Sequence, residues 1–205
     1  MNPKISVIIP AYNAEKTLRR CLDSVFASDF LESMEVILVN DGSKDGTLEV
    51  AEEYWKFPNF VLIDQPNGGV ARARWSGISA SRGEYLGFVD ADDYIAPDMM
   101  SKMYSKIRST MAQICICGFF LMQEEHAIET QDYKEIEIEK NEASIKKIIN
   151  NKLNSSLWNK IFDRKLIKEE NLSKTVGISY GEDLLLLYFA LRRAEIIAYL
   201  AERLY

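Results

Sequence analysis

The sequence predicts an α/β protein with a mostly parallel sheet that is covered by helices on both faces. Two observations support this class. Four short, almost uninterrupted apolar runs occur in the first ninety residues, and each is followed by a segment with helical spacing. Strands that are buried on both faces have this continuous apolar character. A repeated strand–helix order predicts that neighbouring strands run parallel.

The four apolar runs are predicted to be buried strands. They are short, rich in β-branched residues, and end at polar or turn-forming residues. They occupy residues 5–10, 35–40, 60–64 and 84–90.

The segments after the first three strands are predicted to be helices. In residues 12–28, Leu18, Cys21, Leu22 and Val25 fall on one helical face, and Asn13 is predicted to be the N-cap. A turn-rich segment and a loop separate the other helices from their strands. These two helices are expected at 47–55 and 70–81.

The second half has a less regular pattern, and we expect it to pack on the first sheet as one unit. Its predicted elements are a helix at 97–109 with Pro97 in its first turn, a strand at 112–122, an exposed or edge strand at 133–140, and helices at 142–153 and 182–194. Residues 195–205 form an apolar run that stops in mid-course, so we expect a first domain or a piece of a longer protein.

Composition excludes several functional classes. The chain has 205 residues and a net charge of -6, so it lacks the basic character typical of nucleic-acid binding. Cys115 and Cys117 lie two apart and share a predicted strand face, but no second Cys/His pair completes a zinc site. No apolar run reaches the roughly 20 residues that span a bilayer. We expect a cytoplasmic protein, peripheral to the membrane if it contacts one.

Polar residues follow each of the four predicted parallel strands. Tyr12 and Asn13 follow the first, Asp41 the second, Asn67 the third, and the segment 90–93 the fourth. Ligands of parallel sheets bind outside the carboxyl ends of the strands. We therefore expect these four segments to converge on one site.

The segment "DADD" at residues 90–93 places three carboxylates within four positions. In an extended chain, Asp90 and Asp92 would face one way and Asp93 the other. Two carboxylates on one face suit Mg²⁺ or Mn²⁺ with positions left for phosphate oxygens. The alternative is a solvated acidic turn, which is common in its own right.

The segments "IPAYNAEKTL", "VNDGSKDGT", "NGGVARARWSG" and "GEYLGFVDADD", in this order, resemble the family 2 glycosyltransferases. These are inverting enzymes with the GT-A fold, a Rossmann-like, mostly parallel sheet. The resemblance covers essentially the whole chain and is strongest over residues 5–95. "LWNKIFDRKLI" at 157–167 looks like a segment of bacterial capsule and exopolysaccharide members.

The resemblance implies a nucleotide site in the first half of the chain. Tyr12 would stack on the base, and Asp41 would accept the uracil imide N–H, although Asp41 also suits a plain turn. Arg74 would lie near the nucleotide. The family usually reads Ala-Arg-Asn there, and Trp75 departs from it. Arg72 is read as a surface charge rather than a second phosphate partner.

The same resemblance assigns the aspartate segment and its neighbours. Asp90 would hold the ribose and Asp92 the metal, while Asp93 would support that site or share the metal. Pro10 and Ala91 are assigned to the nucleotide site, and Asp93 and Trp158 to acceptor or sugar contact. Trp158 suits a pyranose face or a core position equally well.

A catalytic base is implied at the start of the late helix, in "GEDLLLLYFAL". Asp183 is favoured over Glu182 as the group that takes a proton from the acceptor hydroxyl. Plain helix capping by acidic residues is the alternative. The domain then divides into a nucleotide-sugar-binding half at 1–95 and an acceptor and base half at 96–205.

The implied function is metal-dependent, inverting transfer of a sugar from a UDP-sugar to a saccharide or lipid-linked acceptor. Any membrane contact would lie outside this chain. A dinucleotide-binding oxidoreductase or P-loop enzyme would need glycine-rich motifs that the sequence lacks. A sugar-nucleotide pyrophosphorylase would need a basic, glycine-rich N-terminal loop. A non-catalytic or inactive nucleotide-sugar-binding domain remains open.

Overall fold

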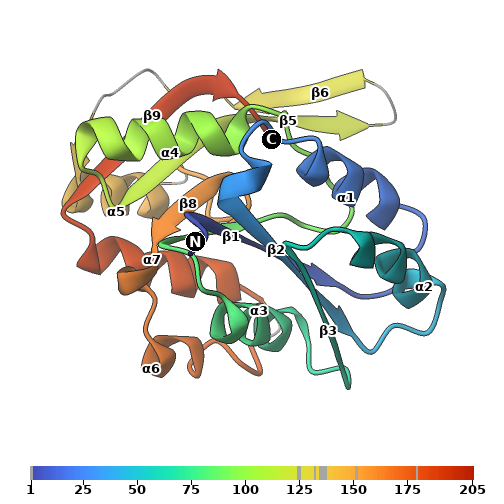
Figure 1. Cartoon of the computed structure of the whole chain (residues 1–205). Helices are drawn as coiled ribbons and strands as arrows, with labels where there is room; N and C mark the ends of the chain where they lie inside the picture. The colour runs from blue at the N-terminus through green and yellow to red at the C-terminus, as the bar shows by residue number, and fades with distance from the viewer. Residues whose placement is uncertain (1, 124–125, 132, 134–137, 151, 179) are drawn as a thin grey trace.

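The computed structural model of the chain describes residues 2–123, 126–131, 133, 138–150, 152–178 and 180–205. These residues form a twisted sheet with helices against both faces (Figure 1). The strands are β1 Ile5–Ala11, β2 Met34–Asp41, β3 Phe60–Gln65, β4 Tyr85–Phe88, β5 Ile114–Gln123, β6 His126–Gln131, β7 Glu139–Lys140, β8 Lys160–Asp163 and β9 Ile196–Arg203.

The helices follow the predicted positions closely in the first half. Short 3₁₀ turns occur at Leu31–Ser33, Glu53–Lys56 and Arg164–Leu166. The α-helices are α1 Leu18–Phe26, α2 Thr47–Glu52, α3 Val70–Ala80, α4 Met99–Thr110, α5 Asn141–Ile149, α6 Glu169–Leu172 and α7 Glu182–Arg193.

The strand order across the sheet is β3-β2-β1-β4-β8-β5-β9-β7, and β6 pairs with β5. The pairs among β1, β2, β3 and β4 are all parallel, which confirms the predicted class. Their carboxyl ends therefore meet at one edge, where the site is predicted. Strands from both halves of the chain contribute to this one sheet.

The described core consists of three clusters. Ile5, Val7 and Ile9 of β1 belong to the cluster that contains residues of α1, α2 and α4, whereas Ile8 belongs to the one that contains residues of α3 and α7. This alternation is the period of two that a strand imposes. A small third cluster joins β2 to α3. Both faces are covered, so the strands are apolar at nearly every position.

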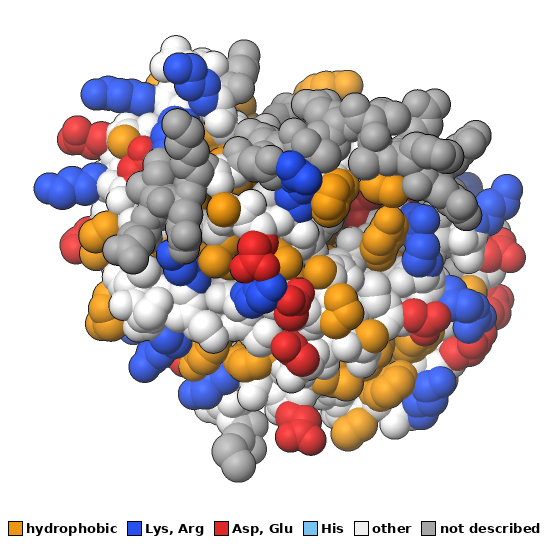
Figure 2. Space-filling view, turned by 90° about the horizontal axis from the view of Figure 1, so that it is seen from above, with side chains coloured by type: hydrophobic (Ala, Val, Ile, Leu, Met, Phe, Trp, Pro, Cys, Tyr) orange, Lys and Arg blue, Asp and Glu red, His pale blue; other side chains and the backbone are white. Residues whose placement is uncertain are grey.

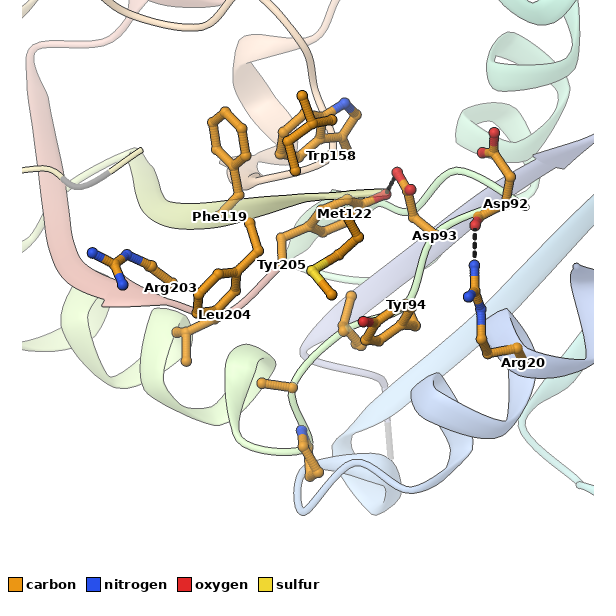
Figure 3. Close-up of a pocket in the computed structure, with 15 residues that line it drawn as sticks. Arg20, Asp92, Asp93, Tyr94, Phe119, Met122, Trp158, Arg203, Leu204 and Tyr205 are labelled. Carbon is orange, nitrogen blue, oxygen red and sulfur yellow. Dashed lines mark hydrogen bonds between the residues drawn. The ribbon is translucent and has the colours of Figure 1, made fainter. Parts of the chain in front are cut away.

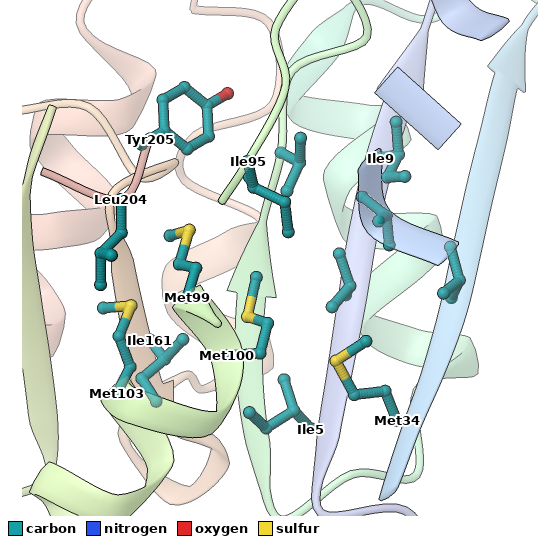
Figure 4. Packing of buried hydrophobic residues seen from close by; sticks show 14 of the residues in the cluster. Ile5, Ile9, Met34, Ile95, Met99, Met100, Met103, Ile161, Leu204 and Tyr205 are labelled. Atoms are coloured by element: carbon teal, nitrogen blue, oxygen red, sulfur yellow. The ribbon is translucent and has the colours of Figure 1, made fainter. Parts of the chain in front are cut away.

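Three methionines of α4 fill the space between that helix and the sheet (Figure 4). Met99, Met100 and Met103 are fully buried and lie beside Ile161 of β8 and Leu204, which follows β9. Unbranched thioether side chains adapt to irregular gaps of this kind. Helix α4 thus joins the two halves of the sheet.

Two predicted helix starts are wrong. Helix α1 begins at Leu18 after Thr17, and Asn13 instead has a φ of 51° and accepts a hydrogen bond from the backbone N–H of Lys44. Its side chain ties the first loop to the second rather than capping a helix. Helix α4 begins at Met99, and the carbonyl of Pro97 is held by the hydroxyl of Ser28.

In the second half, the predicted strand at 112–122 and the predicted helices near 142 and 182 are confirmed as β5, α5 and α7. The predicted edge strand at 133–140 is confirmed for β7, which ends the sheet, while 134–137 lie outside the described residues. Strands β6 and β8 were not predicted. The final apolar run forms β9, parallel to β5.

All three cysteines are buried in the core. Cys21, Cys115 and Cys117 are buried free thiols, and the last two enter the same core cluster, as their alternation predicts. No helix within the described ranges is long and apolar enough to cross a membrane. Seen from above, acidic, basic and apolar side chains are interspersed on one face (Figure 2).

Candidate active site

A cleft of about 700 Å³ opens at the carboxyl edge of the parallel strands. Its lining comes from β1 and the loop after it, from α3, and from the turn after β4. The cleft brings together five residues that the sequence analysis assigned to a nucleotide site, together with Asp92, which it assigned to the metal. The five are Pro10, Tyr12, Arg74, Asp90 and Ala91.

Tyr12 is the aromatic group of this cleft. Its side chain is 49% exposed, so a ring face is open to a flat ligand. Asn13 fixes the loop that carries Tyr12, because its backbone N–H donates to the hydroxyl of Ser43 at 3.0 Å. The cleft therefore has an aromatic surface on a loop that is tied to the neighbouring loop.

Asp41 does not line the cleft. It is 2% exposed, and its carboxylate accepts hydrogen bonds from the Gln65 amide and from the backbone N–H groups of Gly68 and Gly69 at 2.7–3.1 Å. These bonds hold the loop after β3 in place before α3 begins. Its assignment to the base therefore remains a proposal.

Gly42 lies where the loops after β2 and β3 touch. Its φ is +70°, and an added Cβ would lie 2.6 Å from the backbone nitrogen of Asn67. Only glycine tolerates both conditions. Asn67, which we expected at the site, is exposed there and does not line the cleft.

Arg74 is the centre of the charged site. Its side chain is only 6% exposed and lies between three carboxylates from distant segments. One guanidinium nitrogen contacts Asp183, its closest partner, and Glu182 at 3.4 Å, while the other contacts Asp90 at 3.4 Å. Helix α3, the turn after β4 and the first turn of α7 thus meet at one cation.

Glu182 and Asp183 begin α7, after Gly181 in the left-handed region. They line a small cavity next to Arg74 rather than the large cleft. Burial, opposed by Arg74 and reinforced by Glu182, raises the pKa of Asp183 to about 6. A carboxylate with that pKa is a suitable general base near neutral pH.

The aspartate segment is a turn rather than an extended strand end. The backbone N–H of Asp93 donates to the carbonyl of Asp90 at 3.1 Å, and β4 already ends at Phe88. Asp90 and Asp92 nevertheless line the same cleft, while Asp93 is directed to Tyr205 at 2.8 Å. Burial raises the pKa of Asp90, and Arg74 opposes that rise.

Asp92 is the exposed carboxylate of this turn, and it borders two cavities. Its backbone carbonyl accepts from Arg20 at 2.7 Å, which fixes the turn from the α1 side. Within the described ranges, no three acidic, Cys or His side chains are grouped as a metal centre. A single carboxylate still fits Mg²⁺ or Mn²⁺, since these ions are often held by one or two carboxylates plus substrate phosphates.

The second cavity also measures about 700 Å³ and has aromatic walls (Figure 3). Trp158, a predicted sugar contact, is half-buried there and stacks on Tyr205 with ring centroids 4.4 Å apart. Phe119 meets Trp158 edge to face at 4.7 Å. Asp93 lies in the same wall, so both predicted acceptor contacts are in this cavity.

Several lining residues were not found from the sequence. Arg20, Tyr94, Phe119 and Tyr205 line the second cavity beside Asp92 and Asp93. Arg20 lies over the Tyr94 ring at 4.8 Å. These residues come from α1, from the segment after β4, from β5 and from the residues that follow β9. In the sequence, these residues belong to no recognised motif and look like ordinary helix and strand residues, so nothing marked them as part of a site.

Comparison with known sequences identifies relatives of this architecture. The profile described as glycosyl transferase family 2 matches residues 6–175. The chain is 33% identical over its whole length to the uncharacterized glycosyltransferase EpsJ of Bacillus subtilis, of which the match covers 61%. It is 36% identical over 115 residues to the hyaluronan synthase of Pasteurella multocida, covering 56% of this chain and 12% of that protein.

Comparison with solved structures agrees. S. aureus TarS residues 1–349 in complex with UDP-GlcNAc superimposes with a TM-score of 0.84 and 25% identity, covering 98% of this chain and 57% of that one. The chain thus spans 61% or less of the length of these relatives. The fold of this chain therefore matches that of a protein whose structure was solved in complex with UDP-GlcNAc.

Proposed function

The chain belongs to glycosyl transferase family 2 and has the GT-A fold, and on that premise we propose a donor, an acceptor and a mechanism. The proposed reaction transfers a sugar from a UDP-sugar to a hydroxyl group of a saccharide or lipid-linked acceptor in polysaccharide synthesis. The UDP-GlcNAc complex of TarS and the name of the hyaluronan synthase relative support this choice of substrates.

The observation that carries the proposal is the position of Arg74. It lines the cleft, is almost fully buried, and its Nε has no hydrogen-bond partner among the described residues. A buried donor without a partner is costly, so such a group is expected to meet a ligand. The oxygens of a nucleoside diphosphate match a guanidinium in both charge and geometry.

The base and ribose would lie on the other side of the cleft. Tyr12 would stack on uracil, and Pro10 and Ala91 would complete that wall. Asp90 would accept hydrogen bonds from the ribose hydroxyls. Asp41 would accept from the base if the loop at residues 65–69 opens toward it, because its oxygens already serve that loop.

Asp92 would hold Mg²⁺ or Mn²⁺ together with the donor diphosphate. Such an ion, when bound, offsets the negative charge that develops on the leaving diphosphate. Asp92 suits this role because its carboxylate is exposed in the cleft, while Arg74 and Tyr205 engage the carboxylates of Asp90 and Asp93.

Asp183 would act as the general base. It would take the proton of the acceptor hydroxyl as the acceptor oxygen bonds to the anomeric carbon. The bond from that carbon to the diphosphate breaks on the opposite side, so the configuration inverts without a covalent enzyme intermediate. Arg74 contacts the Asp183 carboxylate in the unliganded structure. When the donor binds, the guanidinium would contact the diphosphate as well, and its weaker contact with Asp183 would leave that carboxylate able to accept the proton.

The acceptor would enter through the second cavity. This cavity and the donor cleft both include Asp92 in their lining, so a group in each would meet beside the metal ligand. Aromatic side chains such as Phe119 and Trp158 pack well against the apolar faces of pyranose rings. Asp93 supplies a polar contact in the same wall.

Calorimetric titration of UDP into the protein, with Mn²⁺ and again with EDTA, tests the nucleotide site. We expect binding that requires the metal, and weaker or no binding of GDP and TDP. If none of the three nucleotides gave a binding signal, the proposal would be overturned. Turnover of UDP-sugars by the full-length protein tests the reaction, and binding without turnover would favour the non-catalytic alternative.

A further inference from the structure

The hydroxyl group of Tyr205 makes two hydrogen bonds to the aspartate turn, one as acceptor and one as donor. This hydroxyl accepts a hydrogen bond from the backbone N–H of Asp90 at 3.0 Å. It also donates one to the carboxylate of Asp93 at 2.8 Å (Figure 3). The two partners are the first and last residues of the turn. A single phenol thus fixes both ends of the segment that carries Asp92.

The rest of Tyr205 is held firmly. Its ring stacks on Trp158 at an interplanar angle of 20°, and its backbone carbonyl accepts from the N–H of Phe120 at 2.9 Å. The preceding residue, Leu204, accepts from the N–H of Ala96, which follows the turn, at 2.8 Å. The hydroxyl is therefore presented to the turn from a rigid position.

The turn needs such a support because its carboxylates repel one another. Two of the three carboxylates have a partner that holds them. Arg74 contacts the carboxylate of Asp90 at 3.4 Å, and the Tyr205 hydroxyl donates to the carboxylate of Asp93 at 2.8 Å. Asp92 is the exposed carboxylate of the turn.

We propose that Tyr205 is a positioning residue that holds the Asp90–Asp93 turn in the shape that presents Asp92 to the donor's metal ion. This inference rests on the proposed function. It concerns a residue at the far end of the chain, 112 positions from Asp93. Residues that orient a metal ligand in this way change metal affinity by about 10- to 100-fold when they are lost.

The test is the Tyr205→Phe substitution, which keeps the ring and its stacking but removes both hydrogen bonds. Mn²⁺ is titrated at a fixed UDP concentration and followed by calorimetry. We expect the apparent Kd for Mn²⁺ to rise about tenfold or more. In EDTA neither protein should bind UDP measurably, because the proposed binding requires the metal.

Tyr199→Phe is the matched control. Tyr199 is a buried tyrosine of β9, the strand that precedes Tyr205, and its hydroxyl contacts Ser144 at 2.9 Å, on a different face of the sheet from the turn. It should lose a similar hydrogen bond without changing the Mn²⁺ requirement. An apparent Kd within twofold of wild type for Tyr205→Phe, or an equal rise in both variants, would overturn the proposal.

Amide hydrogen exchange gives a readout that needs no nucleotide. In the unliganded protein, peptides covering residues 90–94 should exchange at least about tenfold faster in Tyr205→Phe than in wild type, because the Asp90 N–H loses its acceptor. Unchanged exchange would contradict the proposal directly. Failure of the wild type to bind UDP with Mn²⁺ would instead refute the proposed function, and the exchange measurement would still decide the role of Tyr205.

Discussion

Arg74 and Asp183 form a buried ion pair although they lie 109 positions apart in the chain. Their contact joins α3, which belongs to the parallel half, to the first turn of α7. Glu182 and Asp90 share the same cation. The proposed donor site and the proposed base therefore share one buried cation.

Arg74→Met should destabilise the protein by about 3 kcal/mol at pH 7, because three partly buried carboxylates lose their cation. Urea unfolding followed by circular dichroism measures this loss. The loss should be smaller at pH 5, where Asp183, with a pKa of about 6, is largely protonated in the folded protein. Arg72→Met on the exposed side of the same helix is the control, with an expected change under about 0.5 kcal/mol. Equal losses in the two variants would argue against a central role for Arg74.

Asp183→Asn should keep metal-dependent UDP binding and lower turnover at least about 100-fold, because an amide cannot take the acceptor proton. In wild type, kcat/KM should fall as the pH drops below about 6, since the base must be deprotonated. Steady-state rates of the full-length enzyme from pH 5 to 8 check both statements. Glu182→Gln serves as the comparison, and a larger loss there would move the base to Glu182.

Asp92→Asn should abolish the binding of UDP that depends on Mn²⁺, while leaving the fold intact. Its carboxylate is exposed, so the change removes a metal ligand and little packing. Calorimetry with Mn²⁺ and with EDTA makes the comparison. Asp45→Asn is a matched control in the same cleft, where the Asp45 carboxylate accepts from the backbone N–H of Thr47 at 3.1 Å. Retained metal dependence in Asp92→Asn would exclude it as the ligand.

Glu35→Gln should cost about 1–3 kcal/mol of stability at pH 7, because this buried carboxylate accepts from Ser6 at 2.6 Å and from Arg82 at 2.9 Å. Burial alone would raise the pKa of Glu35, but these hydrogen bonds outweigh it and hold the pKa below its usual value. The stabilisation is thus present above the unfolded pKa and is lost as the pH falls through the folded one.

Unfolding in urea at pH 7 and at successively lower pH tests the Glu35 prediction. The difference between wild type and Glu35→Gln should shrink as the pH falls below about 4. Glu32→Gln, on the exposed turn before β2, should behave as wild type throughout. A difference that grows in acid would contradict the assigned direction of the pKa shift.

The parallel half could be predicted from the sequence because its signals are local. Each of its strands is a continuous apolar run, and each following helix has apolar residues at helical spacing. The convergence of Tyr12, Arg74, Asp90 and Asp92 then follows from topology alone. The shape of the aspartate turn did not follow, because a hydrogen bond between Asp93 and Asp90 replaces the extended backbone that was expected.

The remaining errors have a common physical cause, which is dependence on distant partners. The residues around Asn13 predict an N-cap, but its side chain instead accepts a hydrogen bond from the backbone N–H of Lys44. Strand β8 has only four residues and a buried lysine, so its pattern is weak until β4 and β5 are placed on either side of it. Tyr205 belongs to the site only because β9 lies beside β5.

The position of β8 also bears on how the chain acquires its fold. β4 and β5 are adjacent in sequence order, yet the strand between them comes from residues 160–163. During synthesis, the β4 edge therefore stays without its neighbour until these residues have left the ribosome. An unpaired edge is a site of faulty association, and pairing over such separations slows folding. We therefore expect the sheet to close late, and the proposed site residues from the two halves of the chain to come together only after that closure.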